Sequence, residues 1–567
     1  MRYLYLSDSK YWIFAILSGT ALILAAALNL PVELPIGESF WDTYIYIDGA
    51  HRLSIGQEIY REFHAPVGPL NYILFDLLGS LFPHGNVALV IQWCMMLVTL
   101  PVIAVICLQA RERGPFAVFG LLLPYLMFSL LPFNVTSWNV FPGVDGFAYY
   151  NRHSSVLLYL LVAALFFVRS HIALVGLVSV LLLSLAFVKI SGFAIAGLVL
   201  AFALLTRRIG IGVSIAVAAL CLSIAAVLEI STGSVSAYLH SALRLLDAND
   251  GVLLTNLVTT VSARFDVILV AAILAAYLLF SRLRGGENLL LSFDRGHPRN
   301  PEPGRLDQDW LWLAVLIFAN TLFESQNFGG AAFVSTWPLL VVLVLATPPE
   351  RRMRLSPLLV LVGLIAFPTA TKVLHSAARA AATTINNVAV ETEHLPANMR
   401  FSAKALTVEA AAAAQPILSG GRATYEKYAD ANILPAYWLY FDHRFQVNVL
   451  KTMDEVIGAI RKREADFGHH YEVIDLRDFA NPVTAAMGRT PARGISIGGD
   501  PYRAVLPLTG EEADLLSQTD LVLLPTCPVT AARKKLHQKY RAAYEGFNRI
   551  ALTDCFDALE HPRYATR

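Results

Sequence analysis

"PVELPIGESFWDTYIYIDGAHRLSIGQEIYREFHAPVGPLNYILF" occupies residues 31–75 and follows the first long apolar segment of the chain. In this stretch Trp41-Asp42-Thr43-Tyr44 opens a predicted amphipathic helix that runs to about Ile55 and ends at Gly56, and a second short amphipathic piece follows over 58–63. Prolines and a glycine in 64–69 then turn the chain back towards lipid. Aromatic residues would hold this loop at a bilayer surface, where a lipid head group is handled: Trp41, Tyr44, Tyr46, Tyr60 and Phe63. We therefore interpret it as an active-site loop.

The composition around this loop is that of a membrane protein. The 567 residues are 56% hydrophobic and 15% charged, with a mean hydropathy of +0.54, values that soluble domains of this size do not reach. The net charge of +1 favours neither nucleic acid nor a polyacidic partner. We expect a polytopic α-helical protein.

Apolar runs long enough to span a bilayer predict about eleven transmembrane helices. They occupy 11–30, 87–109, 115–132, 154–169, 172–188, 190–206, 209–230, 265–280, 310–323, 331–346 and 355–371. The first run is longer than a signal-peptide core and predicts an uncleaved anchor. The shorter run at 69–82 lies between two prolines, and we place it as a surface or re-entrant helix of the first loop.

Positive charges set the expected orientation. With the N-terminus in the cytoplasm, the inner loops hold most of the arginines between the spans, as the positive-inside rule requires. The expected location is the inner (plasma) membrane, with outer loops at 31–86, 133–153, 231–263 and 324–330. The Arg-, Gly- and Pro-rich inner loop 281–308 is expected to be a flexible connector facing anionic lipid.

The composition changes after Thr371, which divides the chain into a transmembrane domain, 1–375, and a soluble outer domain, 376–567. Strand signals at 471–476, 520–525 and 547–554, with a helix signal at 531–545, predict an α/β layer there. A further helix is expected over 403–415. Cys527 and Cys555 follow two of these strands at one sheet edge, so they either form a disulfide or remain unpaired.

A first span is followed by "WDTYIYIDGAHRLSIGQEIYREFHAPVGPL", then by a short amphipathic helix and a long series of spans. In this order of its segments the chain resembles the GT-C superfamily. Its members are glycosyltransferases that depend on polyprenyl-phosphate sugars, such as protein O-mannosyltransferases, lipid A transferases and oligosaccharyltransferases. The resemblance implies that Asp42, the acid just after the first span, is catalytic. It also implies a second acid in the next outer loop, where Asp145 is available, to assist the donor phosphate or a metal. Many members carry two adjacent acids, whereas this chain has Asp42-Thr43.

Physical chemistry supports two interpretations of Asp42. Partial desolvation beside Trp41 raises a carboxylate's basicity towards that of a general base for a sugar hydroxyl. Alternatively, Asp42 caps the helix that starts at Thr43. Asp48 and Arg52 stand four apart on that helix, which favours an ion pair.

Other polar residues of the outer loops are candidates for substrate contacts, each with a structural alternative. His64 could orient an acceptor or a phosphate, or form a structural hydrogen bond. Tyr44 and Tyr60 could stack on a sugar, or belong to an interfacial belt. Glu324, Gln326 and Asn327 could bind sugar hydroxyls, or form a solvated turn.

Two cations suit a lipid phosphate. Arg152 at the outer interface can bind a phosphate bidentately, although snorkelling would also explain it. Lys189 lies within apolar sequence, where an ammonium is costly and by default functional. We expect both to contact the donor phosphate. The cofactor stays open; a divalent cation such as Mg or Mn would use Asp42 and Asp145.

The sequence thus predicts a membrane glycosyltransferase that moves a sugar from a polyprenyl-phosphate donor to an acceptor on the outer face, by inverting displacement with Asp42 as base. The acceptor is a glycolipid, a polysaccharide or a protein; membrane lipid is a further partner, and no nucleic acid is expected. The alternatives are a transporter or lipid-sugar flippase, a polysaccharide polymerase or ligase, and a non-catalytic scaffold.

Overall fold

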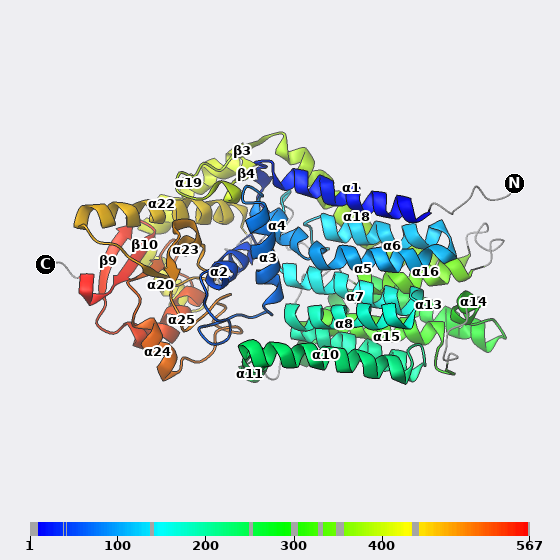
Figure 1. Ribbon diagram of the computed structural model, residues 1–567. Coiled ribbons are helices and arrows are strands. Elements are labelled where there is room, and N and C mark those ends of the chain that lie inside the picture. The colour runs from blue at the N-terminus through cyan, green and yellow to red at the C-terminus, as the bar shows by residue number, and fades with distance from the viewer. Residues whose placement is uncertain are drawn as a thin grey trace.

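The computed structural model shows an elongated molecule with a helical bundle at one end and a mixed α/β part at the other (Figure 1). It describes residues 9–37, 39–40, 42–135, 141–248, 253–295, 304–326, 333–347, 356–433 and 442–564. The helices α2 (Asp42–Ser54) and α3 (Leu70–Leu81) lie between the two ends. The first loop therefore sits where the bundle meets the C-terminal part.

Each of the eleven apolar runs contains a helix of the bundle. These are α1 (Ser9–Leu28), α4 (Val87–Cys94) with α5 (Met96–Ala110), α6 (Pro115–Leu130), α7 (Tyr149–Phe167), α8 (His171–Val188), α9 (Ile190–Leu205), α10 (Ile211–Thr232), α13 (Phe265–Leu283), α15 (Asp309–Gln326), α16 (Trp337–Ala346) and α18 (Pro357–Thr384). Within the described residues, six helical segments are long and apolar enough to cross a membrane: Lys10–Leu28, Val87–Arg113, His171–Val188, Ile211–Thr232, Phe265–Leu283 and Pro357–Thr384. The chain is a multi-pass membrane protein; eleven crossings stay a prediction.

The helices of the bundle differ in how many of their residues are buried. All residues of α7 except Tyr150 are buried, whereas α10 buries only Val217. A helix that is apolar all round must lie either in a core or in lipid. We therefore place α7 at the centre and α10 at the lipid-facing rim. Shorter helices complete this half: α11 (Ser234–Ala248), α12 (Leu253–Ala263) and α14 (Leu289–Asp294).

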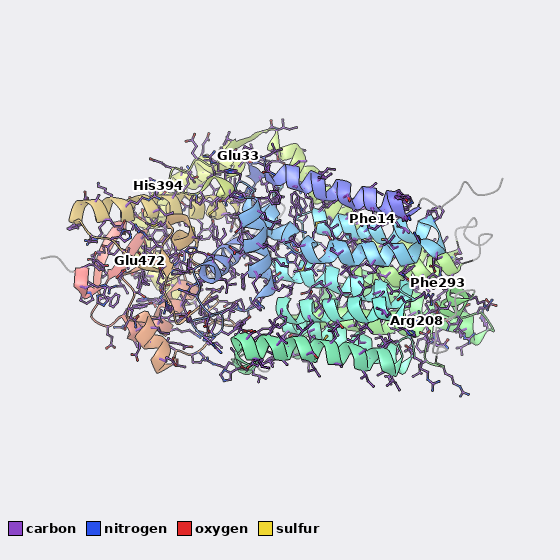
Figure 2. All side chains as sticks on the ribbon, viewed as in Figure 1. Phe14, Glu33, Arg208, Phe293, His394 and Glu472 are labelled. Carbon is purple, nitrogen blue, oxygen red and sulfur yellow. A yellow bond between two sulfur atoms is a disulfide. The ribbon has the colours of Figure 1, made fainter. Side chains whose placement is uncertain are left out.

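Buried ion pairs close the end of the bundle that lies away from the C-terminal part, where Figure 2 labels Arg208 and Phe293. Arg208 reaches Asp294 at 3.1 Å and Asp307 at 2.8 Å, and Arg169 reaches Asp294 at 2.7 Å. The expectation of a flexible connector over 281–308 was therefore wrong for its described residues, because Asp294 and Asp307 anchor it. Residues 296–303 lie outside the described part of the chain.

The C-terminal part contains a five-stranded sheet in the order β6-β5-β8-β10-β9. The strands β5 (Val473–Leu476), β6 (Thr490–Pro491) and β8 (Leu521–Pro525) run parallel, and β10 (Phe556–Glu560) is antiparallel to β8 and to β9 (Asn548–Thr553). Its helices are α19 (Ala405–Gly420), α20 (Arg422–Asp430), α22 (His443–Phe467), α23 (Pro482–Met487), α24 (Gly510–Leu516) and α25 (Ala531–Tyr540). The predicted strands at 471–476, 520–525 and 547–554 and the predicted helices over 403–415 and 531–545 are confirmed.

A disulfide joins two neighbouring strands of this sheet. Cys527, just after β8, bonds to Cys555, just before β10, with the Cα atoms 4.9 Å apart. The paired alternative for these cysteines is confirmed. It follows from strand register, since β8 and β10 are antiparallel neighbours whose ends meet.

Two small sheets tie the first loop to the C-terminal part. β1 (Leu34–Pro35) pairs with β4 (Phe401–Lys404), which also pairs with β3 (Asn387–Ala389). β2 (Phe63–His64) pairs in parallel with β7 (Ile495–Ser496). Aromatic residues of the loop share one hydrophobic core with the C-terminal strands and helices. The loop is therefore built into the fold and does not lie free on a bilayer surface.

Candidate active site

Asp42 stands at the start of α2 with only 3% of its surface exposed. Its Oδ2 accepts a hydrogen bond of 2.8 Å from the backbone N–H of Ala148, the residue before α7. Burial raises the pKa of Asp42 to about 7; the N–H of Ala148 opposes the rise, the charge of Asp145 adds to it, and Arg503 and Arg152 oppose it. A carboxylate with this pKa suits general-base work near neutral pH.

Backbone contacts hold the segment before α2 and the segment before α7 together beside Asp42. Ile36 forms a parallel bridge with Val144, whose N–H donates to the carbonyl of Pro35 at 2.8 Å. A Cβ on Gly143 would lie 2.1 Å from the carbonyl oxygen of Ile36, so only glycine allows this approach. The loops meet through backbone, which fixes Asp42 against the start of α7.

Asp145 is a buried carboxylate engaged by backbone. Its Oδ1 accepts from the N–H of Phe147 at 2.9 Å and its Oδ2 from the N–H of Asn134 at 3.3 Å. Burial raises the pKa of Asp145, against the charge of Arg152 and these hydrogen bonds. Asp145 thus links the backbone at Asn134 and Phe147, and its charge also acts on Asp42.

Arg152 lies on the first turn of α7 and keeps donor capacity. Its Nη2 donates to the carbonyl of Asp145 at 3.0 Å, and the guanidinium stacks 4.1 Å from the ring centroid of Tyr149. Its Nε and Nη1 are buried and have no hydrogen-bond partner. A buried guanidinium with spare N–H groups is suited to an anion.

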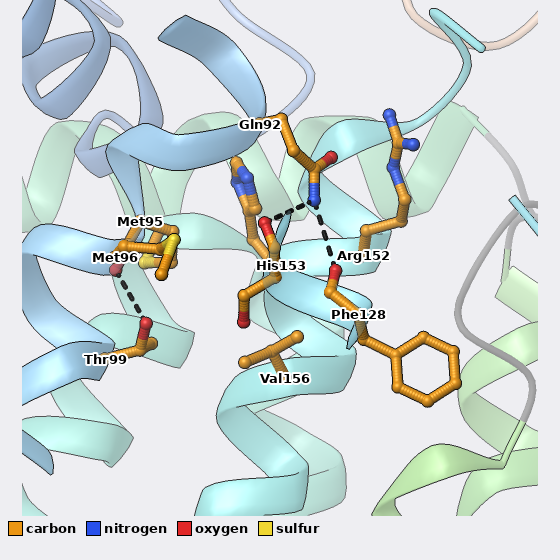
Figure 3. Close-up of a pocket in the computed structure, with 9 residues that line it drawn as sticks. Gln92, Met95, Met96, Thr99, Phe128, Arg152, His153 and Val156 are labelled. Carbon is orange, nitrogen blue, oxygen red and sulfur yellow. Dashed lines mark hydrogen bonds between the residues drawn. The ribbon is translucent and has the colours of Figure 1, made fainter. Parts of the chain in front are cut away.

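A small cavity lies beside Arg152 and His153, and Figure 3 shows its lining from α4, α5, α6 and α7. Gln92 crosses it and donates to the carbonyls of Phe128 and Ser129 at 3.1 and 3.0 Å. The cavity measures about 10 Å³, roughly the space of one water molecule. It is too small for a sugar.

Lys189 interrupts the helical path between α8 and α9 and turns towards the same end of α7. Its Nζ donates to Oδ1 of Asn151 at 2.7 Å and lies 5.3 Å from the ring centroid of Tyr150 and 5.4 Å from that of Phe323. Because Asn151 and Arg152 are adjacent, both predicted phosphate-binding cations gather at the first turn of α7.

Of the predicted cluster Glu324, Gln326 and Asn327, only Glu324 among the described residues interacts with the charges at the start of α7. Glu324 is buried and accepts two hydrogen bonds from Arg264, at 3.2 and 2.9 Å, although its charge also acts on Lys189. Gln326 is exposed at the end of α15. Asn327 lies outside the described residues, as does Trp41 of the first loop.

Three further candidates of the first loop have structural contacts. His64 Nε2 lies 2.7 Å from Oε1 of Glu512, which links the loop to α24. Tyr60 donates to the carbonyl of Val67 at 2.7 Å. Tyr44 packs edge-on against Phe40, with centroids 5.5 Å apart, and its buried hydroxyl has no hydrogen-bond partner. The contact of His64 supports its structural alternative, a hydrogen bond, and the role of Tyr44 and Tyr60 stays a prediction.

Two residues near Asp42 were not predicted. Arg503 follows β7 in the chain and is held by Asp500 at 2.8 Å; its charge acts on both Asp42 and Lys189. Asn151 positions Lys189. Neither stands out in the sequence, because Arg503 lies 461 residues from Asp42 and Asn151 is an ordinary first-turn residue.

Few of the described side chains could bind a divalent cation. Among the described residues no group of three or more His, Cys, Asp or Glu side chains is placed to hold a metal. Asp42 and Asp145 are of the carboxylate type that Mg²⁺ uses together with substrate phosphates, so these two would hold such an ion.

No protein-family model matches the sequence, and no curated protein matches it. Among solved structures, the chain is similar to apo ArnT from Cupriavidus metallidurans, with 13% identity over 99% of this chain and 100% of that one and a TM-score of 0.43. ArnT bound to undecaprenyl phosphate aligns with 14% identity, 99% of both chains and the same TM-score. The archaeal oligosaccharyltransferase AglB from Archaeoglobus fulgidus, in complex with an inhibitory peptide and a dolichol-phosphate, aligns with 12% identity over 98% of this chain and 75% of that one, at a TM-score of 0.36.

Proposed function

We propose that this protein is a membrane glycosyltransferase that moves a sugar from a polyprenyl-phosphate donor to an acceptor hydroxyl. One observation carries the proposal: a buried acid and two cations meet at one helix end. Asp42 binds Ala148, the residue before α7; Arg152 is on the first turn of α7; Lys189 binds Asn151 on that turn.

The chemistry follows from this arrangement. Asp42 takes the proton of the acceptor hydroxyl while the oxygen attacks the anomeric carbon. The bond from that carbon to the phosphate oxygen breaks, and the polyprenyl phosphate leaves on the opposite side, with inversion. A phosphate is a competent leaving group, so no covalent enzyme intermediate is needed.

Arg152 and Lys189 neutralise the charge that grows on the departing phosphate. The start of α7 adds the positive end of a helix dipole. Arg503 contributes further positive charge from the C-terminal part. Where a divalent cation binds, Asp42 and Asp145 would hold it, and it would supply additional positive charge.

The proposed site faces outwards, in the orientation that the inner-loop arginines favour. The C-terminal part is then an extracytoplasmic α/β domain that covers the first loop and helps select the acceptor. Its contacts through β2 and β7 make this cover a fixed part of the site.

The test uses purified protein in lipid nanodiscs, with transfer and donor binding measured separately. Asp42→Asn should lower transfer by about 10²-fold or more and leave polyprenyl-phosphate binding near normal. Lys189→Ala should weaken both, because a phosphate contact exists in the ground state as well as the transition state. Arg61→Ala is the matched control: Arg61 is a half-exposed cation of the same loop, paired with Glu58. Normal transfer by Asp42→Asn would reject the proposal, and a transporter would become the better interpretation.

A further inference from the structure

A second, larger cavity lies in the C-terminal part, between α20 and α25, which Figure 1 places on the far side of α2 from the bundle. Its volume is about 160 Å³, roughly ten times what one water molecule requires. Leu524, Pro525 and Thr526 at the end of β8 line it, together with Arg477 just after β5. Because β5 and β8 are parallel neighbours, the cavity sits at the carboxyl ends of parallel strands, where α/β sheets commonly bind ligands.

The polar lining of this cavity is almost wholly basic. Among the described lining residues, the single acid is Glu426, and the nitrogen-bearing side chains are Arg422, Arg477, Arg533, Lys534, His537 and Arg549. They come from α20, the end of β5, α25 and β9, so positive charge surrounds the space from several directions. Such a concave, basic space favours an anion.

Carboxylates outside the lining hold five of these cations in place: Asp478 lies 2.6 Å from Arg533, and Asp430 pairs with Lys534. Asp475 lies 2.6 Å from Arg477, and Asp557 lies 2.7 Å from Arg422 and 2.5 Å from Arg549. These ion pairs fix the guanidinium groups and lower the cost of gathering like charges.

Two residues of the lining have buried nitrogens without a hydrogen-bond partner. Arg477 is 1% exposed, and its Nε and Nη1 have no hydrogen-bond partner. Nδ1 of His537 is likewise buried without one. The Arg477 guanidinium also stacks on the rings of Tyr540 and Tyr544, 4.0 and 4.8 Å from their centroids. A guanidinium fixed beside a cavity suits an oxyanion, because its planar N–H groups match phosphate oxygens.

We propose that this cavity binds a single phosphate group, as inorganic phosphate or as a phosphate monoester. The forked N–H groups of the arginines match phosphate oxygens, and cations on several sides suit a tetrahedral dianion better than a planar carboxylate. The volume leaves room for the first atoms of an ester. This site is distinct from the one at Asp42 and does not depend on the proposed transfer reaction.

Titration of the full-length purified protein with inorganic phosphate, by calorimetry at constant ionic strength, tests the proposal. We expect saturable binding of one phosphate. The double variant Lys534→Gln/Arg549→Gln should weaken it by about tenfold or more, since charge-assisted hydrogen bonds are lost. Both side chains are partly exposed, 34% and 57%, so the variant should fold. Lys535→Gln is the control, because Lys535 lies on the same helix, is exposed and does not line the cavity.

Arg477→Lys keeps the charge but removes the fork, and it should also weaken binding. Competition against bound inorganic phosphate then identifies the natural ligand. If a short-chain phosphatidic acid displaces the phosphate more strongly, the ligand is a lipid; if glycerol phosphate does, the ligand is a soluble ester. Either order supports a phosphate site. Absence of saturable phosphate binding, or binding that the double variant leaves unchanged, would overturn the proposal.

Discussion

The carboxylate of Asp42 accepts a 2.8 Å hydrogen bond from the backbone N–H of Ala148. This bond joins the segment before α2 to the start of α7. The carboxylate therefore accepts a hydrogen bond from Ala148 and does not cap α2. Asp42 is itself the first residue of α2, so the capping alternative is not supported. The bond leaves Asp42 buried, oriented and close to the charges of Asp145 and Arg152.

Asp42 should make the protein less stable as the pH rises. Burial raises its folded-state pKa from 3.8 to about 7, so the folded state binds a proton that the unfolded state releases. This stabilisation is complete below about pH 3.8 and is lost as the pH rises to about 7. Asp42→Asn imitates the protonated form and can still accept from Ala148. Its thermal stability should exceed that of wild type increasingly from pH 4 to 7, by up to about 4 kcal/mol. A difference that does not change with pH would contradict this.

The rate of sugar transfer should rise with pH and level off above about 7. Below its pKa, Asp42 is protonated and cannot accept a proton, so kcat/KM should fall about tenfold per pH unit. Asp145→Asn removes a charge that raises the pKa of Asp42 and should therefore move the midpoint to lower pH. A profile in which Asp42→Asn and wild type have the same midpoint would assign the titration to another group.

Local patterns predicted the helices and strands, whereas contacts between distant segments could not be predicted. The eleven apolar runs and the strands β5, β8 and β9 have clear periodicities. The pairing of His64 with Ser496, 432 residues away, has no local signature, because a two-residue strand is fixed only by the tertiary fold. For the same reason Arg503 was missed, and Glu324 could not be recognised as the partner of Arg264. Lys189 was selected because a charge within apolar sequence is costly, Arg152 because it lies at a predicted interface, and Asp42 because of the resemblance to the GT-C superfamily; their roles stay predictions.

The disulfide between Cys527 and Cys555 should be detectable by counting thiols. In denaturant without reductant, three cysteines should be alkylated, namely Cys94, Cys107 and Cys221, and reduction should expose all five. Mass spectrometry gives both counts. Cys527→Ser/Cys555→Ser should show three in both conditions and lose about 3 kcal/mol of stability, for a closed loop of this length. Five alkylated thiols before reduction would show that the bond does not form in the cell.

Surface labelling of intact cells should establish the orientation. A cysteine introduced at Ser234 or at Ser419 should react with an impermeant thiol reagent, because the predicted orientation places both residues beyond the outer ends of spans. A cysteine at Ser292, in α14 between inner-loop arginines, should react only after the cells are opened. The unmodified protein provides the background, since its free thiols are in apolar helices. Labelling of the Ser292 position from outside would reverse the orientation and place the Asp42 site in the cytoplasm.

The ion pair between Asp48 and Arg52 should be essential for the attachment of α2 to the C-terminal part. The pair is 2.7 Å long and nearly inaccessible; Arg52 also donates to the carbonyl of Ala492, and Asp48 accepts from the N–H of Asn481. Asp48→Ala leaves a buried guanidinium without its counter-charge, which should cost about 3–5 kcal/mol in thermal or denaturant unfolding.

The chain offers a matched control in the same loop. Glu58 pairs with Arg61 at the same distance of 2.7 Å, but the two side chains are 58% and 50% exposed. Glu58→Ala should therefore cost no more than about 1 kcal/mol. Replacing both members of the buried pair, as in Asp48→Ala/Arg52→Met, removes the stranded charge and should recover part of the loss. If Asp48→Ala proved as mild as Glu58→Ala, the pair would not be what holds α2 in place, and the position of Asp42 would have to depend on the backbone contacts at Val144 and Ala148 alone.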